Sequence, residues 1–401
     1  MIRLGGDAPM KARLIILLAI VLMNAVGMSI VIPLLPFLVG QYLPKQQVVV
    51  GMSALLSVFA VCTFIAAPIL GALSDRYGRR NILIISLLGS VIGYVLFGIG
   101  GSLWVLFVGR IIDGLTAGNI STLFAIISDS TTPEERTKWF GYMGAVMGIG
   151  LLTGPALGGL LGAIDLSLPF FMTAGIISLS VVAVYFWLPE SLSAEKRTKQ
   201  LNVDSFNVFS HLKDFTKIKL LLIAGILFYA GLEIFQFNFT IFLKDIFKWG
   251  PAYIGGILTL AGVCEIISRA ILLPWFLKHF NEKLTGKMGL IILGLGFIFI
   301  LGSMFLSSVI LIYPAVICIL AGEGLFDPTY NSLLSQSVDE SNQGKLQGVN
   351  QGLQSCTRVL IPLGAGTIYY YRPFVLYFIA TLIIIFSMII HEKSFSHRRH
   401  R

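Results

Sequence analysis

The sequence predicts an all-α membrane protein with twelve transmembrane helices in two pseudo-symmetric six-helix halves. Three observations lead to this prediction: 56% of the 401 residues are hydrophobic, only 12% are charged, and the mean hydropathy is +0.86. A soluble globule needs about 25% charged residues, so a soluble enzyme is excluded. Since about 20 apolar residues cross a bilayer, this length supplies about twelve crossings and little extramembrane domain.

Uncharged stretches of the first half are each long enough to span a bilayer, and one further span carries charge. They are residues 14–44, 46–74, 81–109, 139–164 and 166–189, with the charged span at 114–128 extended back through Arg110 and Asp113. The second half repeats the pattern near 220–243, 251–277, 286–306, 308–333, 347–370 and 373–391. Residues 190–219 are polar and basic, so we expect halves at 1–189 and 220–401 joined by this cytoplasmic linker.

Lysine and arginine are unevenly distributed between the two sets of loops. With both termini placed in the cytoplasm, only Lys45, Lys244, Lys248 and Arg372 lie in outer loops. The positive-inside rule therefore predicts cytoplasmic termini and a multi-pass protein of the plasma or bacterial inner membrane. The net charge of +9 has the same topological origin, so no nucleic-acid partner is expected. The four cysteines lie in apolar runs, so we expect neither disulfides nor thiolate metal sites. The basic tail SFSHRRHR is expected to set the membrane orientation and not to bind a metal, and no cofactor is expected.

A charged loop follows the second span. Residues 71–83, GALSDRYGRRNIL, closely resemble the signature loop between helices 2 and 3 of the major facilitator superfamily. Glycine permits helices to approach, and aspartate contributes little to topology, so Asp75 favours a specific role. In that family the loop latches a cytoplasmic gate, and an acid and an arginine after helix 4 pair with it. The resemblance implies gating by Gly71, Asp75, Arg76, Arg79, Arg80, Asp129 and Arg136.

Two further motifs resemble the drug/proton antiporter branch of this superfamily. Residues 109–119, GRIIDGLTAGN, resemble its helix 4 motif, in which Arg110 occupies the arginine position. An arginine inside a span must be paired or hydrated, and Asp113 lies close to the same helix face, so the two form either a coupling site or a structural ion pair. Residues 144–162 resemble the helix 5 motif of exporters, which implies helix packing through Gly148, Gly154, Pro155, Gly158 and Gly159.

Residues 322–366 resemble helices 10 and 11 of the tetracycline/proton antiporters, including GKLQG after the cytoplasmic turn. The chain departs from that subgroup at three positions. Asn24 stands where the subgroup has a helix 1 aspartate, Glu265 stands where it has a helix 8 histidine, and its helix 9 aspartate falls in the uncharged MGLIILGLG. The substrate pocket is therefore expected to differ chemically from theirs.

Five acids lie within the expected spans: Asp113, Glu233, Glu265, Glu323 and Asp327. The histidines lie in loops and the tail, so a coupled proton must be carried by one of these acids, with Glu233 and Glu323 the leading candidates. Glu323 and Asp327 are four residues apart and share a helix face. Two neighbouring carboxylates rarely both ionise at low dielectric, so one should bind a proton unless Arg358 neutralises it.

The expected span 220–243 carries aromatic and amide side chains, the kinds of group that bind an amphipathic organic ligand. About half of these rings are expected to face lipid. The cavity candidates are Asn24, Tyr229, Phe235, Gln236, Asn238, Tyr330 and Arg358.

No phosphate-cradling loop or enzyme motif occurs, so neither catalysis nor an ATP-driven pump is expected. The interpretation is a monomeric, proton-coupled exporter of a drug-like compound that works by alternating access, with substrate bound between the halves. The alternatives are a metabolite or siderophore exporter or an uptake symporter on the same fold, and a non-transporting receptor. The substrate and the proton stoichiometry are not specified by the sequence.

Overall fold

The computed structural model describes residues 10–117, 119–192, 197, 218–338 and 343–396, and the statements below concern these residues. They form helices joined by turns, without a strand, and the predicted all-α class is confirmed. Most of the expected linker 190–219, and residues 397–401 of the tail, lie outside the described residues.

The described residues fall into two compact units. Unit 1 draws on residues within 1–44, 55–205 and 250–258, and unit 2 on residues within 45–54, 206–249 and 259–401. The first eight helices are α1 (Met10–Ile30), α2 (Leu35–Val39), α3 (Val48–Tyr77), α4 (Arg79–Ile99), α5 (Leu103–Leu115), α6 (Asn119–Ser130), α7 (Pro133–Ile164) and α8 (Leu168–Trp187). The others are α9 (Lys219–Ile246), α10 (Pro251–Ile267), the π-helical η4 (Ser268–Leu272), α11 (Leu273–His279), α12 (Glu282–Phe305), α13 (Ile312–Ser335), α14 (Gln343–Tyr371) and α15 (Pro373–Ser396).

Ten stretches among the described residues are helical, long and apolar enough to span a membrane. Two expected spans are helical but do not meet that measure. The fourth consists of α5, which ends at Leu115, and α6, which begins at Asn119. α14 carries many polar residues, among them Asn350, Gln351, Gln354 and Arg358. Polar side chains in a span are costly unless they face protein or water, so α14 depends on its neighbours for stability.

The start of the fourth span differs from the prediction. The uncharged stretch 81–109 contains α4 from Asn81 onward and the first half of α5, because the chain turns at Gly100 and Gly101. Both have positive φ, +60° and +83°, a conformation that glycine adopts without steric cost. The expected start near Arg110 is therefore wrong, since hydropathy does not register a turn made of uncharged residues.

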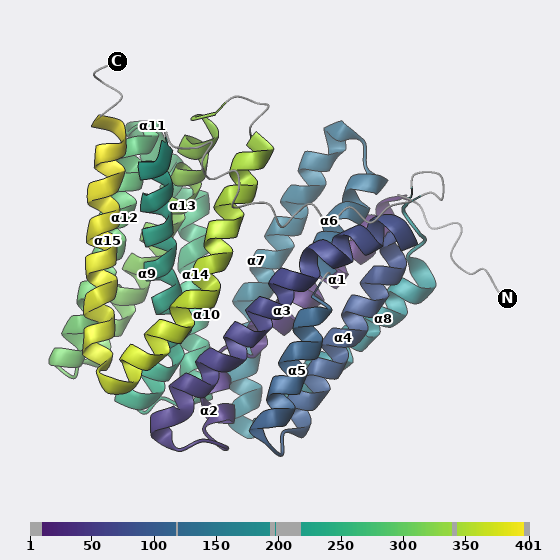
Figure 1. Cartoon of the computed structure of the whole chain (residues 1–401), viewed down its shortest axis with the longest axis horizontal. Helices are drawn as coiled ribbons and strands as arrows, with labels where there is room; N and C mark the ends of the chain where they lie inside the picture. Colours follow the sequence, from purple (N-terminus) through teal and green to yellow (C-terminus); the bar gives the residue numbers. More distant parts are fainter. Residues whose placement is uncertain (1–9, 118, 193–196, 198–217, 339–342, 397–401) are drawn as a thin grey trace. The chain divides into compact units, whose positions relative to one another are not determined.

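Unit 1 packs α1 against α7 and α4 against α8, as Figure 1 shows for its purple and blue helices. Gly154 and Gly158 of α7 face the backbone of α1: a Cβ on Gly154 would lie 2.9 Å from the Val26 carbonyl oxygen, and one on Gly158 would lie 3.0 Å from the Ile30 carbonyl carbon. Ser29 Oγ also donates to the Gly150 carbonyl at 3.1 Å. Small residues in membrane helices permit such close backbone approach.

The remaining residues of the packing motif at 144–162, which lies on α7, are placed differently. No described atom lies within 4 Å of a Cβ on Gly148, so this expected packing residue faces away from the contact. A Cβ on Gly159 would instead lie 2.9 Å from the Cα of Gly255 within unit 1, and Pro155 lies inside a continuous α7. The glycines of this motif therefore allow α7 to approach two helices, α1 and α10.

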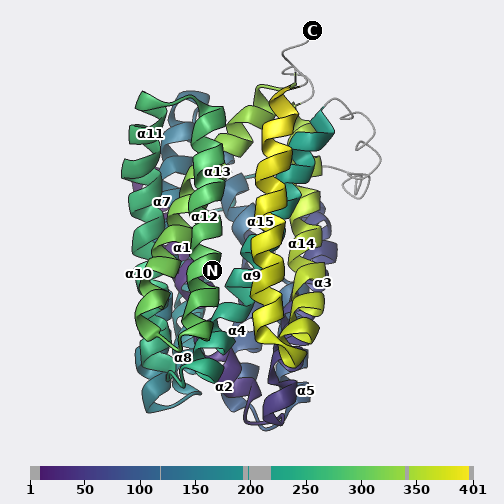
Figure 2. The same cartoon turned by 90° about the vertical axis from the view of Figure 1, so that its left-hand side faces the viewer.

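Unit 2 gathers α9, α12, α13, α14 and α15, which lie side by side in Figures 1 and 2. α9 contacts α13, α14 and α15, so its aromatic side chains are enclosed. Phe228, Phe235, Phe237 and Phe239 are buried and Tyr229 is half-buried. The expectation that half of these rings face lipid is wrong for α9, because three other helices cover it.

We predict that Gly158→Ala destabilises the protein while Gly148→Ala does not. The new methyl group at position 158 meets the α1 backbone, and overpacking of this kind costs roughly 1–3 kcal/mol. At position 148 the methyl group has space, and alanine favours a helix over glycine by roughly 0.5–1 kcal/mol. Thermal unfolding of both variants in detergent measures the difference. Equal midpoints would show that the α1–α7 contact adapts to the added volume.

Candidate functional site

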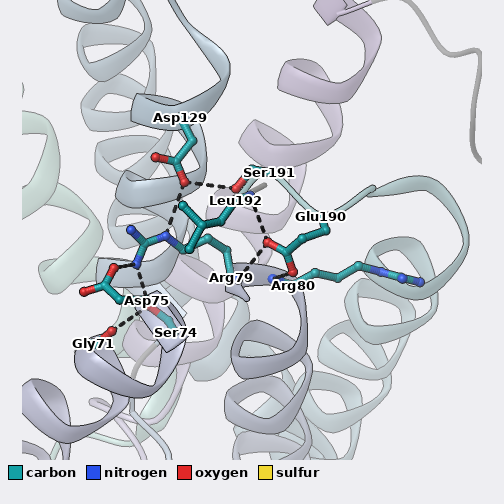
Figure 3. A network of polar contacts seen from close by, with 9 residues as sticks. All are labelled: Gly71, Ser74, Asp75, Arg79, Arg80, Asp129, Glu190, Ser191 and Leu192. Carbon is teal, nitrogen blue, oxygen red and sulfur yellow. Dashed lines mark hydrogen bonds and ion pairs between the residues drawn. The ribbon is translucent and has the colours of Figure 1, made fainter. Parts of the chain in front are cut away.

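Arg79 is the centre of a polar network at the turn between α3 and α4 (Figure 3). Its guanidinium contacts Asp75 Oδ1 at 2.5 Å and Asp129 Oδ2 at 3.3 Å, and donates to Ser74 Oγ at 2.7 Å. The Arg79 side chain is only 14% exposed, so these pairs are screened less than surface ion pairs. The expected gate acids from α3 and α6 therefore share one arginine from α4.

Glu190 completes this network, although sequence analysis assigns it to the linker. Its carboxylate accepts from the backbone N–H groups of Arg79 at 2.9 Å and Arg80 at 3.3 Å. These N–H groups begin α4 and have no partner within the helix, so the carboxylate acts as an N-terminal cap. Gly78 makes room for it: its φ is +100°, and a Cβ there would lie 2.8 Å from Glu190 Cδ. The sequence signal that could have identified Glu190 is its position directly after the sixth apolar span, 166–189.

Two of the other expected gate residues join this network through their backbone: Arg80 through its N–H, and Gly71 through its carbonyl oxygen, which accepts from Ser74 Oγ at 2.8 Å. Arg80 donates to the carbonyl groups of Val184, at 3.3 Å, and Tyr185, and so binds the end of α8. Arg76 lies over the ring of Tyr77. No described atom lies within 4 Å of a Cβ on Gly71, so the close approach expected there is absent, and the side chain of Arg136 lies outside the described residues.

Arg110 and Asp113 form a buried pair inside unit 1. Arg110 Nη1 lies 3.7 Å from Asp113 Oδ2, and Ser90 Oγ donates to Asp113 Oδ1 at 2.7 Å. The guanidinium stacks over the rings of Phe59 and Phe97, at 5.3 and 4.6 Å from their centroids. Cation–π contacts stabilise a desolvated arginine, so this charge has both an ionic and an aromatic partner.

Asn24, the residue that replaces the subgroup's aspartate, is buried in unit 1. It donates to the Ile20 carbonyl at 3.2 Å and accepts from Asn119 Nδ2 at 2.5 Å. An amide in this position links α1 to α6 without adding a charge.

Arg269 is the centre of a second cluster, in unit 2. It lies in the π-helical turn η4, a type of turn that occurs frequently at functional sites. Its guanidinium is 3.1 Å from Glu265, 3.9 Å from Glu323 and 3.5 Å from Asp327. One cation therefore faces three carboxyl groups.

The three acids differ in their other partners. Asp327 accepts from Tyr229 Oη at 2.7 Å and from Asn331 Nδ2 at 3.1 Å. Glu323 is 8% exposed, and its Oε2 has no hydrogen-bond partner among the described residues. An unsatisfied buried carboxylate oxygen is costly, so Glu323 is the acid least stabilised as an anion.

The expected neutralisation of Glu323 or Asp327 by Arg358 is not found. Arg358 Nε lies instead 3.3 Å from Glu233 Oε1, and its side chain is 65% exposed. The cation that faces Glu323 is instead Arg269, because the wide η4 turn directs this side chain toward α13.

The remaining cavity candidates are spread over different environments. Tyr330 is buried and donates to Asn350 Oδ1 at 3.0 Å, Phe235 is buried, and Gln236 is exposed. Asn238 is buried and donates to the Ile234 carbonyl at 3.1 Å. Phe235, Gln236 and Asn238 of α9 therefore do not share one helix face.

His391 also departs from the prediction, which places every histidine in a loop or the tail. α15 continues to Ser396, and His391 is fully buried in it, with Nε2 3.2 Å from the Lys283 carbonyl. Within the described part of the chain, no group of three or more His, Cys, Asp or Glu side chains is arranged to hold a metal ion.

Comparison with known proteins assigns the family. The model of the Major Facilitator Superfamily matches residues 17–362. The chain belongs to this superfamily. It is 33% identical over 364 residues to the class H tetracycline resistance protein of Pasteurella multocida, with 90% of each chain covered, and 33% identical over 357 residues to the class C protein of Escherichia coli, with 89% of each covered.

A solved bacterial homologue of the human lysosomal transporter Spinster, in an inward-facing state, matches with a TM-score of 0.76. Its sequence is 13% identical, and the match covers 97% of this chain and 98% of the other, so it supports the fold. The predicted major facilitator fold and the resemblance to the drug/proton antiporter branch with its tetracycline subgroup are confirmed.

We predict that Asp113→Asn destabilises the protein by roughly 3–5 kcal/mol, because it leaves the buried Arg110 without its counter-charge. The double variant Arg110→Gln/Asp113→Asn should recover much of that loss, since no unpaired charge remains. Thermal unfolding in detergent compares the three proteins. Wild-type stability of Asp113→Asn would contradict the ionic role of this pair.

Proposed function

We propose that the protein is a proton-coupled secondary transporter that exports an amphipathic, drug-like organic compound by alternating access. The observation that carries the proposal is the cluster around Arg269, in which Glu323 is buried with an unpartnered oxygen. The names of two groups of relatives support export: tetracycline resistance proteins, and the multidrug resistance protein 2 of Bacillus subtilis, 27% identical over 372 residues.

We further propose the topology and assembly predicted above. Both termini are cytoplasmic, residues 1–189 and 220–401 are the two six-helix halves, and 190–219 is the cytoplasmic linker. The protein works as a monomer in the cell membrane. The Arg79 network is then on the cytoplasmic side, as a latch that holds one of two transport states.

Glu323 is proposed as the group that takes up and releases the proton. Asp327 accepts hydrogen bonds from Tyr229 and Asn331 and pairs with Arg269 at 3.5 Å, so its charge has three partners. Among the described residues, Glu323 has a single ionic partner, Arg269, at 3.9 Å. A proton on Glu323 relieves the crowding of negative charge, and its loss is favoured when the site becomes hydrated.

Glu323→Gln is expected to abolish transport driven by a pH gradient while retaining substrate exchange without a gradient. Glutamine mimics the protonated carboxyl group, so binding and the conformational change persist but coupling does not. The assay uses proteoliposomes with an imposed pH gradient and a panel of organic drugs, tetracycline included, to find the transported compound.

Glu233→Gln is the matched control, because Glu233 already has its own cation in Arg358. It should keep most gradient-driven transport. The assignment to Glu323 fails if the pattern is reversed, or if both variants accumulate substrate against its gradient with normal pH dependence. Gradient-driven uptake of the wild-type substrate into intact cells would favour symport over export.

Asp75→Asn is expected to reduce transport strongly in a folded, inserted protein, because it removes the 2.5 Å ion pair to Arg79 that biases the two states. Arg76→Gln is the control, since Arg76 lies in the same turn and outside the Arg79 network. Initial transport rates and the amount of inserted protein are measured together. Full activity of Asp75→Asn would eliminate the latch.

A further inference from the structure

A buried histidine joins α15 to α12 in unit 2, where the two helices lie side by side (Figures 1 and 2). His391 is completely buried, and its Nε2 lies 3.2 Å from the backbone carbonyl oxygen of Lys283 in the first turn of α12. A carbonyl oxygen only accepts, so the hydrogen of the neutral imidazole is on Nε2. Nδ1 is then an acceptor, and it has no hydrogen-bond partner among the described residues.

The imidazole of His391 is closely packed by apolar groups. The rings of Phe326 on α13 and Phe395 on α15 meet it edge to face, with centroids 5.6 and 5.2 Å from its own. Gly286 of α12 leaves the space for it, because a Cβ there would lie 3.4 Å from Nε2 and 3.0 Å from Thr329 Oγ1. The neutral ring therefore fits this site, and the site holds no acceptor for a second N–H among the described residues.

The charged groups around His391 do not compensate a positive charge on it. Lys283 and Lys287 of α12 and the neighbouring Glu392 act on it electrostatically. The carboxylate of Glu392 is exposed and already paired with Lys287 Nζ at 3.0 Å. Lys283 Nζ lies over the ring of Phe395, 4.8 Å from its centroid. Two cations and one engaged anion therefore surround the imidazole.

The neighbouring helices meet this part of α15 with uncharged groups. α13 faces His391 with Phe326 and Thr329, and α9 contacts α15 one turn earlier, where Ser387 Oγ donates to the Ala224 carbonyl at 2.8 Å. A proton on Nδ1 would thus create a charged donor in an apolar site without an acceptor, and burial disfavours such a charge.

We propose that His391 is a pH-sensitive switch, in which a proton on Nδ1 releases the end of α15 from the first turns of α12. The charged ring is favoured where it reaches water, so protonation stabilises an opened arrangement in which this end of α15 has moved off α12. With the orientation proposed above, these helix ends are cytoplasmic, and the switch responds to acidification of the cytoplasm. The argument rests on the packing of unit 2 and not on the transport mechanism.

The pH range follows from the opened arrangement. A histidine exposed to water titrates near pH 6.5, so the closed arrangement keeps its full stability above this pH and loses it as the pH falls below. Because the proton binds to the opened arrangement alone, the population of that arrangement should rise roughly ten-fold between pH 7.5 and pH 5.5.

The test is hydrogen–deuterium exchange of the full-length protein in detergent, with each rate corrected for the intrinsic effect of pH. Amide protection in residues 384–396 of α15 and 282–290 of α12 should fall roughly ten-fold from pH 7.5 to pH 5.5. Peptides of α4 in unit 1 serve as the internal reference and should keep their protection. Detergent exposes both ends of the helices, so the result is independent of orientation and of transport.

His391→Gln keeps a donor for the Lys283 carbonyl and does not titrate, so the pH-dependent loss of protection should disappear. His391→Leu gives the same expectation without a polar group, and thermal midpoints at pH 7.5 verify that both variants are folded. His279→Gln is the matched control, because this exposed histidine of α11 also contacts a backbone carbonyl, that of Trp275 at 2.8 Å. It should keep the ten-fold loss of the wild type.

Three outcomes overturn the switch. The first is equal protection of the wild type at both pH values. The second is a pH-dependent loss that persists in both His391→Gln and His391→Leu, which would place the titrating group elsewhere in unit 2. The third is removal of that loss by His279→Gln.

Discussion

Transfer of a charge from water into a low-dielectric interior costs several kcal/mol unless a partner compensates it, and the polar residues of both units are arranged under this constraint. Arg110 has a carboxylate and two aromatic rings around it, and Arg269 has three carboxyl groups. Arg79, at the end of a span, has two. Each of these arginines holds together helices that are distant in sequence, so charge compensation also organises the packing around it.

The backbone obeys a related constraint at helix ends. The first N–H groups of α4 are satisfied by Glu190, and this is possible because Gly78 leaves space and adopts a positive φ. Arg80 binds the carbonyl groups at the end of α8. The α3–α4 turn, which carries the Arg79 network, is thus held by side-chain hydrogen bonds to Glu190 and from Arg80.

The features predictable from the sequence are those that depend on local pattern. Hydropathy located most of the spans, and the three-residue spacing of Arg110 and Asp113 placed these two side chains on one helix face, where they pair. The turn at Gly100 and the burial of His391 were not predictable in this way, because neither changes the local hydropathy. The partner of Arg358 depends on how each helix is rotated about its axis, and only tertiary packing sets that rotation.

Charge balance distinguishes the two interior clusters. Arg110 and Asp113 are matched one to one, so a proton on Asp113 would leave the arginine without its counter-charge. Arg269 faces three acids, and a proton on Glu323 leaves two carboxylates beside it. Protonation of the acid therefore unbalances the pair in unit 1 but leaves Arg269 compensated in unit 2. The excess of acid over base, which a purely structural ion pair does not need, is the physical reason to place proton coupling at Glu323.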